Sequence, residues 1–511
     1  MRVNFVCCKW GTRYSAEYVN RLYRMCLYNT PMEYDVHFYC YTDNSEGFED
    51  EIKVIDFPDI PDIHPKYWFE TDDFKYGMAR CWDRPKTFIF NTHNFADDKP
   101  TGRFVFFDLD VIIQGDLSPI ITCDLENPRK LRSWWQDPRP MKSRNFKLAH
   151  GAYTNGSCMV WSDDQTECIW QDVLEHQERI WFTFTDGTDN YHSWRWGDFR
   201  PDGKPPLWKH FPNTFAYSYN RGRDWKEKDL EVAKYRKDCI LCVFNVDILP
   251  HDDGTRGKVK QDKLIDEQLL AHWNVPKIDR QNPVDINIYT VKWGEKYSSE
   301  YVNKIFDQCK NKTKYKFDFY CLTEDPAGLS EGIKIIPLPE NNKLEKWWNK
   351  MYLFDKTIVQ QRGEKLFLDL DLIIQHDIDP FIEHDPEDSL CFIKTQWHDL
   401  EQMRLDTREI PHTYTDLNSS VLRWNDNLDV DKITALVKNY TDQMLFYYRG
   451  IDNLFGHKRD RLAKIKFFAE NLVYSYNNGY RWPEDTEKRV IRPDPIICIF
   501  DSMGNAEDIK N

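Results

Sequence analysis

The chain has 511 residues, which at about 100–200 residues per domain predicts several domains rather than one hydrophobic core. Its 69 basic and 84 acidic residues give a formal net charge of −15, the wrong sign for a general nucleic-acid binder, whose affinity comes from neutralising phosphates. The apolar fraction of 41% is enough to build cores, and the mean hydropathy of −0.71, without an apolar run of about 20 residues, predicts no membrane span.

The first residues, MRVNFVCCKWG, predict a β-strand rather than a secretory signal, because their apolar stretch is short and wrongly flanked. Most of the 14 cysteines lie in apolar runs, so we expect reduced, buried thiols and a cytoplasmic location. Cys239 and Cys242 have no second pair at zinc-finger distance and are not expected to bind zinc.

Strands and helices alternate along the first part of the chain. VNFVCC is followed by an amphipathic helix, SAEYVNRLYRMCL, with Ser15 as its expected N-cap. The segments DVHFYCYT, IKVIDF and RFVFFDLDVII predict further strands, the last of them fully buried. This alternation predicts an α/β fold with a mainly parallel sheet, in which ligands bind at the carboxyl ends of the strands.

An internal repeat doubles this pattern. KWGTRYSAEYVN at 9–20 returns as KWGEKYSSEYVN at 292–303, and FFDLDVIIQGDLSP at 106–119 returns as FLDLDLIIQHDIDP at 367–380. Five further blocks recur in the same order: FYCYTD and FYCLTE, NGSCMVW and NSSVLRW, GTDN and GIDN, AYSYNRGRDW and VYSYNNGYRW, ILCVF and IICIF. A period above roughly 200 residues indicates two tandem domains rather than a solenoid.

The two domains are predicted at 1–275 and 284–511. The boundary falls in the polar segment 271–285, which holds two prolines and precedes the strand INIYTV. The greater length of the first copy is assigned to loops, notably 58–75.

A doubled Asp-x-Asp follows a buried apolar run in each copy, as Asp108 and Asp110 and as Asp369 and Asp371. In a strand, residues i and i+2 point to the same face, so each pair would need a cation or a hydrogen-bond network. Hard oxygen ligands suit Mg²⁺ or Mn²⁺, which commonly also hold substrate phosphates. The alternative is a capping or loop role.

The ordered blocks KWG-x-x-Y-x-x-EYVN, FYC-x-T, Asp-x-Asp, N-[GS]-S, G-x-DN, SYN and C-[VI]-F resemble GT-A-fold glycosyltransferases, in particular bacterial and phage proteins similar to glycogenin and the lipopolysaccharide galactosyltransferases. The resemblance spans both halves and implies two tandem, Rossmann-like GT-A domains with a mainly parallel mixed sheet. It implies a hexosyltransferase-type enzyme that uses Mn²⁺ or Mg²⁺ and a nucleotide-sugar donor, usually a UDP-sugar. A glycan or lipid-linked saccharide is the implied acceptor.

The same resemblance implies roles for individual residues. Donor-binding roles fall on Lys9, Trp10, Tyr14, Arg80 and Asn190 in the first copy and on Lys292, Trp293, Tyr297, Lys350 and Asn453 in the second. Sugar-contacting or catalytic roles fall on Asn155, Asp189, Asn418 and Asp452, and metal-ligand roles on Asp108, Asp110, Asn245, Asp369, Asp371 and Asp501. The two tryptophans could instead be core anchors, and Arg80 and Lys350 could be solvated surface residues. Asp189 and Asp452 could act as bases or only orient the sugar.

The last strand departs from the family pattern, because Asn245 and Asp501 stand where the family has a histidine ligand, and the lysine that would follow is missing from both copies. His251 could substitute in the first copy. Three hypotheses follow: an enzyme with two active sites, one catalytic copy with a degenerate partner for acceptor binding or assembly, and a noncatalytic carbohydrate-binding protein or other metal–phosphate enzyme such as a nucleotidyltransferase.

Overall fold

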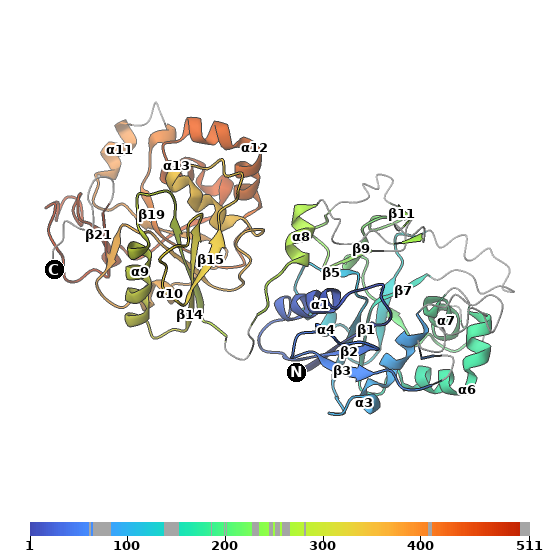
Figure 1. Cartoon of the computed structure of the whole chain (residues 1–511). Coiled ribbons are helices and arrows are strands. Elements are labelled where there is room, and N and C mark those ends of the chain that lie inside the picture. Colours follow the sequence, from blue (N-terminus) through green and yellow to red (C-terminus); the bar gives the residue numbers. More distant parts are fainter. Residues whose placement is uncertain are drawn as a thin grey trace. The chain divides into compact units, whose positions relative to one another are not determined.

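The computed structural model describes the chain except for residues 61–62, 65–82, 137–152, 185–186, 199, 201, 227–234, 245–248, 251–255, 258–265, 279, 281–282, 407–410 and 501–511. The chain divides into two compact units, Met1–Arg280 (unit 1) and Gln281–Asn511 (unit 2), and each is described by itself. Both are α/β units built on a seven-stranded mixed sheet (Figure 1).

The main sheet of unit 1 has the strand order β3-β2-β1-β4-β7-β6-β8. The strands are β1 (Arg2–Lys9), β2 (Asp35–Thr42), β3 (Lys53–Asp56), β4 (Arg103–Phe107), β6 (Arg129–Arg132), β7 (Thr154–Ser162) and β8 (Lys209–His210). The first four in chain order are parallel, whereas β7 runs antiparallel to both β4 and β6. β7 therefore begins at the edge where the parallel strands end.

Side chains alternate across β1 as the pleat requires. Phe5 and its like-facing neighbours pack with α1 (Ala16–Tyr28) and α8 (Glu267–Trp273), while Val6 faces the cluster formed by η1 (Arg84–Asn91) and α6 (Glu167–Thr183). Both faces of the sheet are thus covered (Figure 1). The other helices in the described part of unit 1 are short: α3 (Thr92–Phe95), α4 (Ser118–Ile121), α7 (Thr188–Tyr191) and the π-helix η2 (His192–Trp196).

The predicted long strand RFVFFDLDVII is two strands. β4 ends at Phe107, and β5 (Val111–Ile113) pairs with β10 (Leu241–Val243) in a separate three-stranded sheet completed by β9 (Ala216–Ser218). The intervening Asp108–Asp110 segment is a turn in which the Val111 N–H donates to the Asp108 carbonyl at 3.3 Å. Because this segment turns, the alternation of side chains along a strand does not describe where the two aspartates point. A small hairpin, β11 (Leu249–Pro250) and β12 (Arg256–Gly257), completes the described strands of this unit.

Unit 2 repeats this architecture with the order β15-β14-β13-β16-β19-β18-β20. Its strands are β13 (Ile286–Lys292), β14 (Phe317–Thr323), β15 (Ile333–Pro337), β16 (Lys365–Leu368), β18 (Leu390–Lys394), β19 (Leu417–Trp424) and β20 (Ile465–Phe467). A second sheet joins β17 (Leu372–Ile374), β22 (Ile497–Ile499) and β21 (Val473–Ser475), so here too the acidic turn links two sheets.

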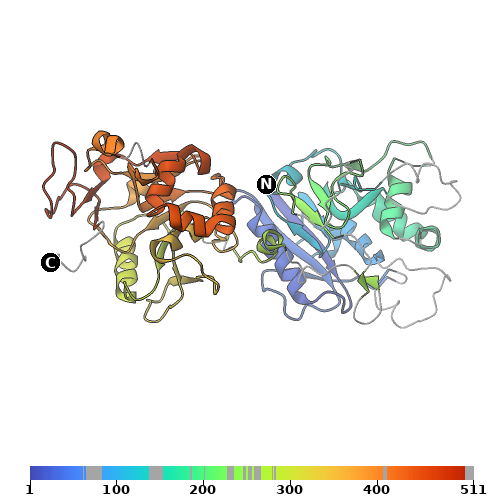
Figure 2. The same ribbon diagram turned by 90° about the horizontal axis from the view of Figure 1, so that it is seen from above.

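The helices of unit 2 lie on opposite faces of its main sheet. α9 (Ser299–Asn311) packs in one core cluster, and η4 (Lys346–Phe354), α12 (Asp431–Tyr447) and α13 (Ile451–Leu462) pack in the other. Figure 2 shows the yellow-green α9 and the orange-red α12 and α13 on different sides of the strands. The short helices are α10 (Asp379–Ile382), α11 (Leu400–Asp406), η5 (Pro411–Thr413) and η6 (Glu470–Leu472).

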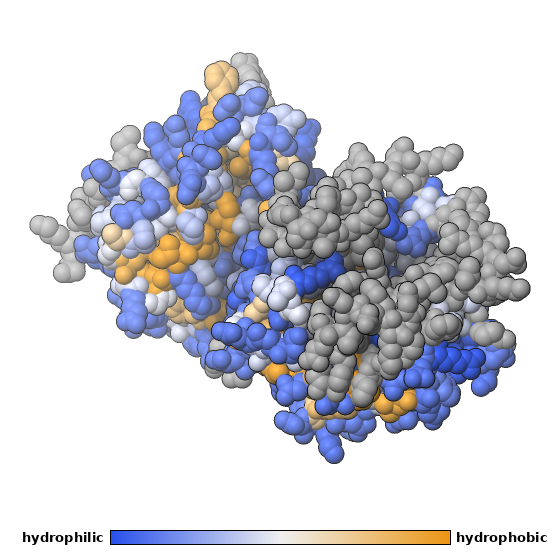
Figure 3. All heavy atoms as spheres, turned by 45° about the vertical axis from the view of Figure 1, so that its right-hand side comes forward, coloured by the Kyte–Doolittle hydropathy of each residue, from blue (hydrophilic) through white to orange (hydrophobic). Residues whose placement is uncertain are grey.

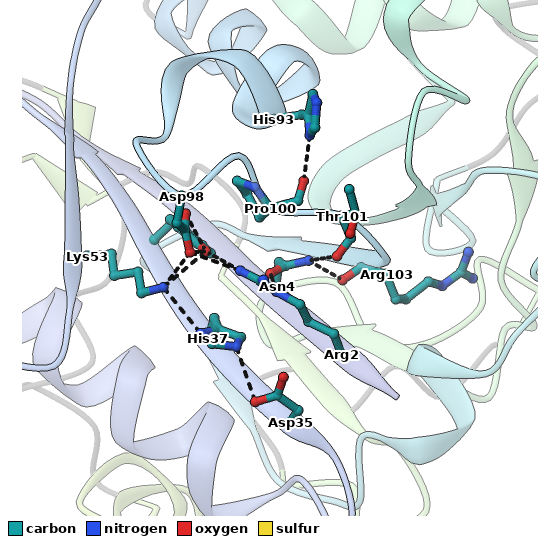
Figure 4. A network of polar contacts seen from close by, with 11 residues as sticks. Arg2, Asn4, Asp35, His37, Lys53, His93, Asp98, Pro100, Thr101 and Arg103 are labelled. Carbon is teal, nitrogen blue, oxygen red and sulfur yellow. Dashed lines mark hydrogen bonds and ion pairs between the residues drawn. The ribbon is translucent and has the colours of Figure 1, made fainter.

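The amino-terminal edge of the unit 1 sheet is held by a polar network (Figure 4). Asp98, in the loop before β4, accepts hydrogen bonds from Lys53 Nζ at 2.6 Å, Arg2 at 3.0 Å and the Tyr39 hydroxyl at 2.7 Å. These donors come from the starts of β3 and β1 and from β2. The network therefore ties one loop to three strands, on the edge opposite to the acidic turn.

The predicted fold class, an α/β chain of two tandem units with mainly parallel mixed sheets, is confirmed by these strand orders. The cysteines in the described residues are free thiols, and most are buried, as expected. Within the described residues, none of the helices combines the length and apolarity that a bilayer crossing needs. On the face seen in Figure 3, hydrophobic residues interrupt the hydrophilic surface of unit 2.

Candidate active site

The predicted site residues gather where the parallel strands end and β7 or β19 begins. The Asp108 N–H donates to the Ser157 carbonyl at 3.1 Å, and the Asp369 N–H donates to the Ser420 carbonyl at 2.9 Å. The antiparallel return of β7 and β19 thus brings the Asn-x-Ser block against the acidic turn in both units. This is the edge at which α/β sheets bind ligands.

In unit 1 the acidic turn is held by a lysine, a serine and a tyrosine. Lys86 Nζ lies 2.6 Å from Asp108 Oδ1, and Ser157 Oγ donates to Asp108 Oδ2 at 3.0 Å. The Tyr14 hydroxyl lies 3.4 Å from Oδ2 of Asp110, which is 1% exposed. Burial favours the neutral form of Lys86, but the carboxylates of Asp108, Asp83 and Asp189 raise its pKa above the ordinary value.

Unit 2 has the same arrangement. Lys350 forms an ion pair with Asp369, and the Tyr297 hydroxyl donates to Asp371 Oδ2 at 3.2 Å. Burial and the neighbouring Asp369 carboxylate raise the pKa of Asp371 to about 7. Two carboxylates this close disfavour a second negative charge, and a cation bound between them would relieve that repulsion.

Lys86 is a site residue that the sequence reasoning missed. Arg80, predicted as the counterpart of Lys350, lies outside the described residues, whereas Lys86 makes the contact in unit 1 that Lys350 makes in unit 2. A weak sequence signal exists, because KTFIF at 86–90 matches KMYLF at 350–354 and keeps the order of the repeat. The apolar residues of these two segments pack in the core, and the lysine is the first residue of each segment.

Asp189 is the third acidic residue of the unit 1 site. Its Oδ1 lies 2.9 Å from Nζ of Lys130, whose side chain has no exposed surface. A Cβ atom added to Gly156 would lie 2.8 Å from that same Oδ1. Burial lowers the pKa of Lys130 despite the carboxylate beside it, and Lys130 also contacts His192 Nδ1 at 2.8 Å.

In unit 2 the corresponding carboxylate is held differently. Asp452 Oδ1 accepts from the Ser419 N–H at 3.0 Å, and the position of Lys130 is taken by Phe392. Burial raises the pKa of Asp452, although the Ser419 hydrogen bonds and Lys350 act in the opposite direction. Lys130 was not singled out in the sequence, because nothing in RKLR distinguishes a buried lysine from a surface one.

The predicted asparagines are engaged with the backbone around the site. Asn155 Oδ1 accepts from the Ser157 N–H at 3.0 Å, and Asn418 Oδ1 accepts from the Ser420 N–H at 2.9 Å. Asn453 donates to the Thr413 carbonyl at 2.7 Å, and Asn190 is buried. These contacts shape the start of β7 and β19 and the segment that carries the third carboxylate.

The residues predicted to contact the donor base lie at the ends of β1 and β13. Lys9 and Lys292 are buried and donate to the carbonyls of Asn44 and Asp325, each at 3.2 Å. Trp10 packs edge-to-face on Phe57 with ring centroids 6.4 Å apart, as a core anchor would.

Trp293 is placed differently, because it lines a cavity of about 670 Å³. The cavity lies at the carboxyl ends of β13, β14 and β15, and η4 closes another side. Its lining includes Thr323, Pro337, Leu338, Lys346 and Asn349. Apolar residues and an indole share these walls with polar side chains, among them Glu324, Glu340 and Glu345, and the indole offers a flat face to a planar heterocycle.

Asn245 and Asp501, the predicted additional metal ligands, lie outside the described residues, as does His251. Among the residues that the structure describes, no group of three or more His, Cys, Asp and Glu side chains is arranged to hold a metal ion. Each unit does supply two hard carboxylate ligands at the turn, which is the donor chemistry of a Mg²⁺ or Mn²⁺ site that keeps positions for phosphate.

Neither a protein-family model nor a curated protein matches the chain. Similar solved structures include the galactosyltransferase LgtC in complex with donor and acceptor sugar analogues, with 15% identity over 42% of this chain and 87% of that one and a TM-score of 0.30. Mouse xyloside xylosyltransferase 1 matches with 12% identity over 43% and 98% of the two chains and a TM-score of 0.30. GlyE of Streptococcus pneumoniae matches with 10% identity over 72% and 91% and a TM-score of 0.31. These structures are glycosyltransferases, the class that the sequence resembles.

Proposed function

We propose that the chain is a metal-dependent glycosyltransferase with an active site in each unit. The observation that carries this proposal is the repeated cluster of two turn carboxylates, a lysine paired with the first of them, and a third carboxylate nearby. One acidic pair with a lysine suits a cation and a diphosphate, and the separate carboxylate suits a reacting sugar.

The proposed donor is a nucleotide sugar, with its base in the cavity beside Trp293 in unit 2. Asp108 and Asp110, or Asp369 and Asp371, would hold Mn²⁺ or Mg²⁺, which supplies Lewis-acid stabilisation of the diphosphate. Lys86 or Lys350 adds a cationic charge beside the same leaving group. The bond between the sugar and the diphosphate breaks, an acceptor hydroxyl oxygen bonds to the anomeric carbon, and the hydroxyl proton passes to a base.

Asp189 and Asp452 are the groups proposed to face the sugar. Lys130 forms an ion pair with Asp189, and the Ser419 N–H donates to Asp452. Either carboxylate could orient the sugar by accepting from its hydroxyls or take the acceptor proton. The acceptor is proposed to be a glycan or a lipid-linked saccharide.

Release of nucleoside diphosphate from a panel of nucleotide sugars tests this proposal. EDTA is expected to abolish release, and added Mn²⁺ or Mg²⁺ to restore it. Asp110→Asn and Asp371→Asn remove one carboxylate charge each at nearly constant volume, so each variant should fold and lose the turnover of its own unit by at least tenfold. Parental transfer by the double variant, or full activity in EDTA, would refute the metal-dependent assignment. Release of pyrophosphate instead of nucleoside diphosphate would indicate a nucleotidyltransferase.

A further inference from the structure

Trp347 is a large apolar side chain at the surface of unit 2, next to the segment that carries Asp452. It is 43% exposed. A Cβ atom added to Gly450 would lie 3.4 Å from the indole Nε1. Gly450 immediately precedes α13, which begins at Ile451 and carries Asp452 in its first turn. The indole therefore flanks the backbone that positions the proposed sugar-facing carboxylate.

The backbone that presents Trp347 is in an uncommon conformation. Lys346, the residue before it, has a φ of +53°, in the left-handed region that non-glycine residues rarely adopt. Such conformations recur at ligand sites. Lys346 and Asn349 line the cavity beside Trp293, while Trp347 contacts Gly450. One turn thus contributes to the cavity wall and, through Trp347, lies beside Gly450.

Unit 1 has a carboxylate at the equivalent position. Asp83 precedes Lys86 by the same spacing at which Trp347 precedes Lys350. Its Oδ1 accepts from the Thr188 N–H at 3.0 Å, beside Gly187, the counterpart of Gly450. The same two segments therefore meet in both units, through a hydrogen-bonded cap in unit 1 and through a half-exposed indole in unit 2.

We propose that Trp347 is the platform on which the sugar ring of an acceptor saccharide stacks in unit 2, an inference that rests on the glycosyltransferase function proposed above. A pyranose presents one face of C–H groups that packs on an aromatic ring while its hydroxyls stay in water. The donor diphosphate instead needs the charged Lys350 and the acidic turn, and its base needs the cavity beside Trp293.

The test isolates unit 2 in an Asp110→Asn background. Transfer from UDP-glucose or UDP-galactose to lactose and to p-nitrophenyl glycosides is measured with Mn²⁺, and KM is determined separately for donor and acceptor. Trp347→Ala is expected to raise the acceptor KM at least fivefold and to change the donor KM less than twofold. Trp347→Phe, which keeps an aromatic face, should recover most of the loss. Phe446→Ala removes a 91% exposed aromatic of the same unit and should change neither constant.

Each other result counts against the inference. An unchanged acceptor KM in Trp347→Ala, a rise in the donor KM alone, or an equal effect of Phe446→Ala would overturn the platform while leaving the glycosyltransferase function standing. Transfer by the wild-type chain that vanishes in the Asp110→Asn background would also overturn it, because unit 2 would then be silent. Failure of the wild-type chain to cleave any nucleotide sugar would instead refute the proposed function itself.

Discussion

Gly156 and Ser419 occupy the same place beside the third carboxylate, yet they meet it differently. In unit 1 the carboxylate oxygen of Asp189 occupies the space that a Cβ atom of residue 156 would need, and it pairs with Lys130. In unit 2 residue 419 has a side chain, and its N–H holds Asp452. Glycine in unit 1 is therefore explained by the close approach of a side chain rather than by its own backbone conformation.

Gly156→Ala is expected to push Asp189 away from Lys130, because the new Cβ would lie 2.8 Å from Oδ1. The displaced atom ends a flexible side chain, so we expect the free energy of unfolding to fall by less than about 1 kcal/mol while unit 1 turnover drops at least tenfold. Calorimetry and single-unit transfer assays in an Asp371→Asn background measure the two effects.

Ser419→Ala is the comparison in unit 2: it keeps the Cβ atom and the backbone N–H that donates to Asp452 but removes the hydroxyl that also hydrogen-bonds Asp452, so a smaller loss of unit 2 turnover is expected. A Gly156→Ala variant with undiminished unit 1 turnover would show that the position of Asp189 is not critical.

At the scale of elements, the sequence predicted the first strands and α1 closely, because a periodic pattern of apolar residues can be recognised within a short stretch of chain. β2 spans the predicted DVHFYCYT, and α1 starts after the predicted N-cap Ser15, although the Ser15 side chain makes no capping hydrogen bond. The division of RFVFFDLDVII into β4 and β5 was missed, because an uninterrupted apolar run does not show which sheet each part joins.

The site was predictable where the repeat marked it and not elsewhere. Asp108, Asp110 and their twins stand out because an acidic pair recurs after a buried strand. Lys130 and Asp83 have no counterpart of the same type in the other copy, so comparing the copies could not reveal them. Their roles depend on contacts with residues distant in the chain, which only the fold brings together.

The Asp98 network ties the amino-terminal edge of the unit 1 sheet together, and it should make stability depend on pH. Burial would raise the pKa of Asp98, but hydrogen bonds from Lys53, Tyr39 and Arg2 lower it from 3.8 to about 2. A carboxyl with a lowered folded pKa stabilises the fold fully above its unfolded pKa and loses that contribution as the pH falls through the folded value. The contribution should therefore be lost between about pH 4 and pH 2.

Asp98→Asn should accordingly lower the unfolding midpoint at pH 7 and flatten its fall between pH 4 and pH 2, as followed by circular dichroism in urea. Asp97→Asn, the neighbouring exposed acid, is the comparison. Parallel curves for Asp98→Asn and the parent would contradict the network's role.

For the whole molecule, the structure places the end of unit 1 beyond the predicted limit of residue 275. Arg280 donates to the carbonyls of Leu27, Thr30, Pro31 and Tyr34 at 3.3, 2.7, 2.7 and 2.8 Å. These carbonyls belong to the end of α1 and the loop before β2. Residue 280 therefore satisfies backbone acceptors of unit 1 that a fragment ending at 275 would leave without this donor.

We propose that each unit folds on its own, and that a fragment of residues 1–282 is more stable than one of residues 1–275. Both should unfold cooperatively, with the shorter one melting several degrees lower, as measured by calorimetry. Arg280→Ala in the longer fragment should reproduce most of that difference. Equal melting temperatures would show that the hydrogen bonds of Arg280 do not stabilise unit 1. An unfolded long fragment would show that unit 1 depends on unit 2.

The acidic turn joins the main sheet to the three-stranded sheet in both units, and this position has a mechanical consequence. The chain leaves the main sheet at Phe107 and enters the three-stranded sheet at Val111, so the carboxylates lie on the short segment that connects the two sheets. A ligand that neutralised these carboxylates would restrain the connecting segment as well as fill the site. We therefore expect occupancy of the site to make the small sheet more rigid, because both depend on the same few residues of chain.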